Sequence, residues 1–98
     1  HILYKNRNDE EAQEFVLNLV HLLKPDKDDL FLDLACGKGR HSIYLNSLGY
    51  SVKGCDLSES SIIHAKKFTK SGLNFFVHDM RLPIKEKFDY VLNLFTSI

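Results

Sequence analysis

The sequence predicts an α/β fold in which strands alternate with helices and build a parallel sheet. Three observations predict it. Residues 30–34 form an apolar run that leads into two glycines and then into a segment with helical periodicity. A second apolar run follows at 51–55, and the alternation continues with a helical segment at 59–70 and an aromatic run at 73–78. Strands that alternate with helical segments in this way are typical of βαβ units with parallel, buried strands.

The amino-terminal part, residues 1–29, is predicted to be a leading segment followed by a helix. Residues 4–7 are short and polar, so we expect them to be irregular. Asn8 or Asp9 can cap the helix, because Glu11 follows Asn8 by three residues as in a capping box. The helix is expected to end near Leu23 and to dock on the sheet with an apolar stripe of 3.6-residue period made of Ala12, Phe15, Val16, Leu19, Val20 and Leu23.

The central strand is predicted at 30–34, with Asp33 near its carboxyl end. Gly37 and Gly39 follow, and glycines permit backbone angles and close approaches that a side chain would prevent. A helix is predicted from Arg40 to Leu48. Its amino end would present free N–H groups to a ligand lying on the glycine turn.

The second unit begins with the strand at 51–55 and ends at Asp56, nineteen residues after Gly37. An acid about 20 residues after the glycine turn holds a ribose diol in nucleotide-binding βαβ units. Ser58 is a good cap for the helix at 59–70. After the third strand, a short connection at 81–87 leads to a fourth strand at 88–95.

These motifs resemble those of the class I S-adenosylmethionine-dependent methyltransferases. The run Asp33-Leu34-Ala35-Cys36-Gly37-Lys38-Gly39 matches that family's D/E-x-G/A-x-G-x-G motif, with Ala35 where many members carry glycine, and Asp56 stands in the post-motif position. The resemblance extends from about Leu30 to Phe95. It implies a Rossmann-like three-layer αβα sandwich of parallel strand order 3-2-1-4. Residues 1–98 would form a single partial cofactor-binding domain, with a βαβαββ core at 30–98.

The resemblance also implies the cofactor, S-adenosylmethionine, and the residues that bind it. Gly37 and Gly39, beside Ala35, would allow close backbone approach, and Asp33 would hold the methionine amino group directly or through water. Asp56 would bind the ribose hydroxyls. The adenine amino group would be received by Asp79, and the adenine ring would lie between Leu57 and Met80. In family members a segment ahead of the first helix folds over the cofactor, so Tyr4 and Arg7 are weaker candidates for its carboxylate.

Composition limits the other classes of function. Thirteen basic and thirteen acidic residues give a formal net charge of zero, which offers no support for nucleic acid as a partner. The apolar runs are shorter than a membrane span, so we expect a soluble, cytoplasmic protein. Cys36 and Cys55 lack metal-ligand spacing, and reduced thiols are expected in preference to a disulfide.

The sequence predicts an enzyme, a methyltransferase, whose catalytic residues it does not identify. Methyl transfer needs no catalytic triad or metal, because the cofactor supplies the leaving group. The run Asn93-Leu94-Phe95-Thr96 lacks the N/D-P-P-Y/W signature of amino-methylating nucleic-acid enzymes, which favours a small-molecule acceptor. Two alternatives are a non-catalytic methyltransferase-like binding subunit and, less favoured, an NAD(P)-dependent oxidoreductase. The latter usually has a third glycine where this chain has Ser42.

The extent of the chain carries a further expectation. The sequence does not begin with methionine, so upstream residues are expected. Family members continue beyond the fourth strand with another helix, a fifth strand and a hairpin, which carry much of the substrate pocket. Without them the fourth strand is an open edge, a liability for solubility. We expect further residues of the chain to complete the sheet, in preference to a partner such as a second copy in a homodimer.

Overall fold

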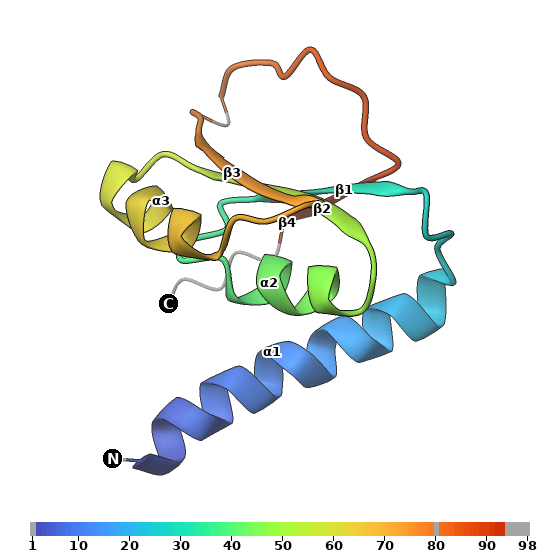
Figure 1. Ribbon diagram of the computed structural model, residues 1–98, viewed down its shortest axis with the longest axis vertical. Coiled ribbons are helices and arrows are strands. Elements are labelled where there is room, and N and C mark those ends of the chain that lie inside the picture. Colours follow the sequence, from blue (N-terminus) through green and yellow to red (C-terminus); the bar gives the residue numbers. More distant parts are fainter. Residues whose placement is uncertain (1, 80, 94–98) are drawn as a thin grey trace.

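The computed structural model describes residues 2–79 and 81–93, with side chains from residue 9 onward. Four strands alternate with helices along the chain, as the apolar runs and glycine turns predict (Figure 1). In chain order the elements are α1 (Ile2–Leu23), β1 (Leu30–Leu34), α2 (Arg40–Ser47), β2 (Ser51–Asp56), α3 (Glu59–Ala65), the short 3₁₀ helix η1 (Lys66–Phe68), β3 (Leu73–Val77) and β4 (Tyr90–Asn93).

The sheet has the strand order β3-β2-β1-β4, and every pair is parallel. This confirms the predicted order 3-2-1-4. Asp33 of β1 lies opposite Gly54 of β2, which lies opposite Phe75 of β3. Because all four strands run the same way, their carboxyl ends meet at one edge of the sheet, where ligands bind in open α/β sheets.

The described helices all lie on one face of the sheet, and the segment between β3 and β4 passes over the other (Figure 1). The described part of the chain therefore contains the sheet and one of the two helical layers of the predicted sandwich. On the face without helices, Leu32 lies between Lys53 and Val91. Val91 is 57% exposed, and the Lys53 ammonium pairs with Glu86 of the covering segment at 2.7 Å.

The hydrophobic core lies between the helices and the sheet. Its largest fully buried side chains are Phe31, Leu45, Ile62 and Leu73. The Phe31 ring stacks on Tyr90 of β4 with centroids 4.9 Å apart. Aromatic pairs at this separation contribute beyond their buried area. The central strand is thereby fixed against its edge neighbour.

The predicted start of the first helix is wrong. α1 begins at Ile2, so residues 4–7 are helical and Asn8 lies inside the helix rather than capping it. The reason is that residues 2–23 contain neither glycine nor proline, so nothing stops a helix formed downstream from extending toward the amino end. An interior asparagine costs well under 1 kcal/mol.

The apolar stripe of α1 is only partly buried. Ala12 and Val16 are inside, whereas Phe15 is 45% exposed. The main neighbour of α1 is α2. Val16 belongs to the core cluster with the strands, and Leu19 and Val20 pack against that cluster while they stay partly exposed. The expected docking of the whole stripe on the sheet is therefore wrong, because α2 lies between much of α1 and the sheet (Figure 1). Among the described helices, none has the length and hydropathy to cross a membrane.

Candidate functional site at the carboxyl ends of the strands

The glycine turn joins β1 to α2 and is held against β2. The Cys36 N–H donates to the Cys55 carbonyl at 2.8 Å, and the Gly39 N–H donates to the Cys36 carbonyl at 3.0 Å. The Ile43 N–H then donates to the Gly39 carbonyl at 2.8 Å. These three hydrogen bonds lead the chain from the strand into the helix at the sheet edge where ligands are expected.

The conformation of this turn explains its small residues. Ala35, Gly37 and Gly39 all have positive φ, at 56°, 60° and 87°. Ala35 therefore adopts a left-handed conformation that costs a non-glycine residue about 1 kcal/mol. A Cβ added to Gly37 would meet no atom within 4 Å. The open space beside Gly37 leaves its backbone accessible to a ligand.

Gly39 differs from Gly37, because its absent side chain makes room for a ring of the core. A Cβ built on Gly39 would lie 2.7 Å from the Phe75 ring, and one built on Gly54 would lie 2.8 Å from the same ring. Phe75 is only 5% exposed. The predicted close approach of a ligand therefore fits Gly37. Gly39 and Gly54 instead leave the space that the Phe75 ring occupies. The packing roles of Gly54 and Phe75 were missed in the sequence.

Asp56 connects the glycine turn to the start of α3. One carboxylate oxygen accepts from the Gly37 N–H at 2.8 Å, and the other accepts from the Ser58 N–H at 2.9 Å. Ser58 itself caps α3, as predicted, with its hydroxyl accepting from the Ser61 N–H. A carboxylate has about four lone-pair sites, so two acceptor positions stay open for a ligand. The side chain is half-buried, at the edge of the sheet.

Asp33 lies deeper than the other candidate residues and is only 2% exposed. The Ser42 hydroxyl donates to its carboxylate at 2.7 Å, which ties the end of β1 to the first turn of α2. Burial raises the pKa of Asp33 to about 6; the Ser42 hydrogen bond opposes this shift, and the Asp56 charge adds to it. The predicted contact with a methionine amino group stays a prediction, and Ser42, at the position of the missing third glycine, is a partner that we did not foresee.

This pKa shift predicts how stability depends on pH. The folded-state pKa of Asp33 is about 6 and its ordinary value is 3.8, so between these pH values the folded state holds the extra proton. Asp33 therefore favours folding below pH 3.8 and loses that contribution as the pH rises through about 6, by about 3 kcal/mol. We expect Asp33→Asn, which keeps an oxygen for Ser42, to flatten this fall in urea-unfolding free energy. Parallel profiles for the two proteins would contradict the assignment.

Asp79 follows β3 and is engaged by its neighbour. The Arg81 guanidinium binds both carboxylate oxygens, with the shortest distance 2.6 Å from Nη2 to Oδ2. This contact holds the pKa of Asp79 below its ordinary value. A ligand amino group would have to use the remaining lone pairs of the carboxylate. Leu57, beside Asp56, is 65% exposed and free to cover an apolar ring, whereas Met80 lies outside the described residues.

The two cysteines are free thiols. Burial raises the pKa of both Cys36 and Cys55, so neither is a ready nucleophile. The Cys55 side chain lies on the same face of the sheet as Leu34. A Cβ on Gly54 would point to the opposite face, and the Cys36 sulfur lies 3.0 Å from that position. In the part of the chain that the structure describes, no three His, Cys, Asp or Glu side chains gather into a possible metal site.

A family model matches nearly the whole chain. The model described as "Tellurite resistance protein TehB" covers residues 3–96. A curated relative from Haemophilus influenzae, named "Probable S-adenosyl-L-methionine-dependent methyltransferase TehB", is 32% identical over 82 residues. The match covers 80% of this chain but 28% of that protein. The chain thus spans less than a third of the length of this relative.

Two solved structures are similar in fold and sequence. The PH0226 protein from Pyrococcus horikoshii is 37% identical with a TM-score of 0.70, and the match covers 88% of this chain and 41% of that one. The tRNA (uracil-54, C5)-methyltransferase of Pyrococcus abyssi, solved with S-adenosyl-L-homocysteine, is 28% identical with a TM-score of 0.66. That match covers 83% of this chain and 21% of the other.

Proposed function

This chain belongs to the TehB family of class I S-adenosylmethionine-dependent methyltransferases, and we propose that it binds S-adenosylmethionine at the carboxyl ends of β1, β2 and β3 as part of a methyltransferase. The observation that carries the proposal is the pairing of Gly37 with Asp56. Gly37 offers an open backbone position, and Asp56 offers a carboxylate with free lone pairs. The Gly37 nitrogen and the nearer Asp56 carboxylate oxygen are 2.8 Å apart.

The residues present fit such a ligand. Asp56 would accept from the ribose hydroxyls while it continues to hold the Gly37 and Ser58 N–H groups. Leu57 would cover one face of the adenine, with Met80 on the other, and Asp79 would accept from the adenine amino group. The backbone of Ala35, Gly37 and Gly39 would border the methionine part. Asp33 would act there through a water molecule or through Ser42, since its own carboxylate is buried.

S-adenosylmethionine supplies a methyl group on a positively charged sulfur, which is already activated for displacement. The task that remains for the protein is to fix the position of the methyl group and to exclude water. The hydrogen bonds that fasten the glycine turn to β2 and to Asp56 give it a rigid support for that task. No catalytic residue is assigned to the described part of the chain.

We propose a small molecule as the methyl acceptor. The zero net charge and the absence of the N/D-P-P-Y/W signature after residue 92 support it. The similarity to a tRNA methyltransferase favours a second candidate, an RNA acceptor. Incubating the protein with radiolabelled S-adenosylmethionine and either a metabolite extract or total RNA separates the two, because label would appear in one fraction only. Label in RNA alone would overturn the small-molecule proposal.

The cofactor itself is tested by calorimetric titration of the full-length protein. We expect S-adenosylmethionine and S-adenosylhomocysteine to bind and NADH not to bind. Binding of NADH alone would favour the oxidoreductase alternative. Absence of binding by all three would favour a non-catalytic methyltransferase-like subunit, and either result would overturn the proposal.

Replacing Asp56 by alanine is expected to weaken S-adenosylmethionine binding by about 1.5–3 kcal/mol, the range for hydrogen bonds to a charged group. The same titration measures it. Asp28→Ala is the matched control, because Asp28 is an exposed acid in the loop before β1, at the opposite ends of the strands. Equal affinities for the two variants would remove Asp56 from the site.

A further inference from the structure

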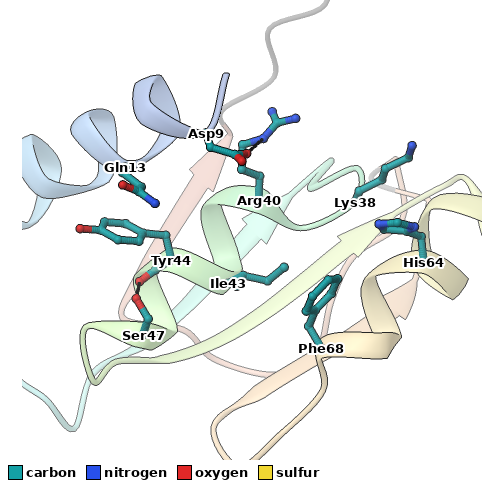
Figure 2. Close-up of a pocket in the computed structure, with 9 residues that line it drawn as sticks. All are labelled: Asp9, Gln13, Lys38, Arg40, Ile43, Tyr44, Ser47, His64 and Phe68. Carbon is teal, nitrogen blue, oxygen red and sulfur yellow. Dashed lines mark hydrogen bonds and ion pairs between the residues drawn. The ribbon is translucent and has the colours of Figure 1, made fainter. Parts of the chain in front are cut away.

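A cavity of about 450 Å³ lies among the three helices, separate from Asp33, Asp56 and Asp79. Figure 2 shows side chains from α1, the glycine turn, α2, α3 and η1 around it. The lining residues used below are Asp9, Lys38, Arg40, Ile43, His64 and Phe68. The volume is within the range of about 300–1,000 Å³ that small-molecule sites occupy.

The polar side of this cavity has an excess of positive charge. Lys38 and Arg40 line it with one acid, Asp9, among the described lining residues. Asp9 is paired with Arg40, but through Nε alone, at 3.3 Å. A guanidinium has five N–H donors, so the terminal nitrogens of Arg40 stay available to a second anion. The Lys38 ammonium and the His64 ring lie along the same rim (Figure 2).

The other side of the cavity is apolar. Ile43 projects from α2 toward the space beside Phe68, whose ring is 45% exposed (Figure 2). The His64 ring lies 6.1 Å from the Phe68 ring in a tilted arrangement. An exposed phenylalanine next to basic side chains suits a molecule that is apolar at one end and negatively charged at the other.

We propose that this cavity is a second ligand site, for a small aromatic carboxylate. The ring packs on Phe68 and Ile43, and the carboxylate pairs with Arg40 and Lys38. Asp33, Asp56 and Asp79 are not among its described lining residues, although Lys38 belongs to the glycine turn that borders the proposed cofactor site. The ligand would contact α1, α2 and α3 at once and would therefore hold these helices together.

The test uses 2-naphthoate as the probe and follows backbone amide NMR signals of the chain. We expect saturable binding with shifts at the start of α2 and at η1, and binding at least tenfold weaker for the neutral 2-naphthalenemethanol, since charge-assisted hydrogen bonds carry about 1.5–3 kcal/mol. Inorganic phosphate alone should bind more weakly than the probe, because it lacks the ring. Shifts confined to the face of the sheet without helices, or equal binding of the neutral probe, would overturn the proposal.

Arg40→Gln and Phe68→Ser should each weaken 2-naphthoate binding roughly five- to tenfold. Both residues are exposed, and the Asp9–Arg40 pair is a surface ion pair, so the variants should fold normally. Lys67→Gln is the matched control: it removes one positive charge beside Phe68 without changing the lining. Equal losses of 2-naphthoate affinity in all three variants would show that net charge alone accounts for the binding. Displacement of the probe by S-adenosylhomocysteine would place it on the cofactor site; either outcome overturns the proposal.

Discussion

Replacing Gly37 by valine is expected to abolish S-adenosylmethionine binding while the chain remains folded. A Cβ at this position would meet no protein atom within 4 Å, so the new side chain would project into the open space beside the turn. We propose that the ligand approaches the protein backbone in that space. The positive φ of 60° adds strain of about 1–2 kcal/mol, which a domain of this size can tolerate.

Calorimetry gives the affinity of this variant, and urea unfolding monitored by circular dichroism gives its stability. Gly49→Val is the matched control for backbone strain. Gly49 also has a positive φ, of 102°, and the nearest atoms to its added Cβ belong to the flexible Lys27 side chain. The control should bind like the parent. If Gly37→Val also titrates like the parent, the ligand does not lie on this turn.

The arrangement of the strands could be predicted because its signals are local. Each strand is an apolar run closed by turn residues, and the alternation with helices restricts the connections to parallel crossovers. The start of α1 could not be predicted from its capping residues, because an interior Asn8 or Asp9 costs well under 1 kcal/mol and no breaker precedes them to end the helix there. The helix after Ser58 is predicted to end at residue 70, which is too late. In the structure α3 ends at Ala65, because residues 66–68 tighten into the 3₁₀ helix η1.

The candidate site could be predicted only in part. The positions of Asp33, Gly37 and Asp56 follow from their places after strands whose carboxyl ends meet. Their partners depend on the register between strands and on the path of the turn, which the sequence does not give. The hydrogen bonds from Gly37 to Asp56 and from Ser42 to Asp33 are of this kind.

The two motif glycines show the same limit. The sequence gives both the same reason, close approach of a ligand, and the structure separates them. Gly37 faces open space, whereas Gly39 faces a ring that belongs to a strand more than thirty residues away in the chain. A motif identifies where glycine is needed, and long-range packing decides why.

Replacing Gly39 by valine is therefore expected to act on stability. The Cβ would lie 2.7–2.8 Å from the Phe75 ring, closer than real contacts of this kind, and φ is 87°. The Phe75 ring cannot move away easily, because it also packs closely on Gly54 of β2, where a Cβ would lie 2.8 Å from the ring. Overpacking of about 1–3 kcal/mol and left-handed strain of about 1–2 kcal/mol together predict a loss of roughly 2–5 kcal/mol in unfolding free energy.

Urea unfolding measures this loss, and a double-mutant cycle identifies its cause. Phe75→Leu removes the ring and alone should destabilise the chain by creating a cavity. In the double variant Gly39→Val with Phe75→Leu, the new methyl groups enter the space that the ring has left. The combined loss should then be smaller than the sum of the single losses by about 1–2 kcal/mol, a coupling expected of residues in contact. Strictly additive losses would show that the ring is not what requires glycine at position 39.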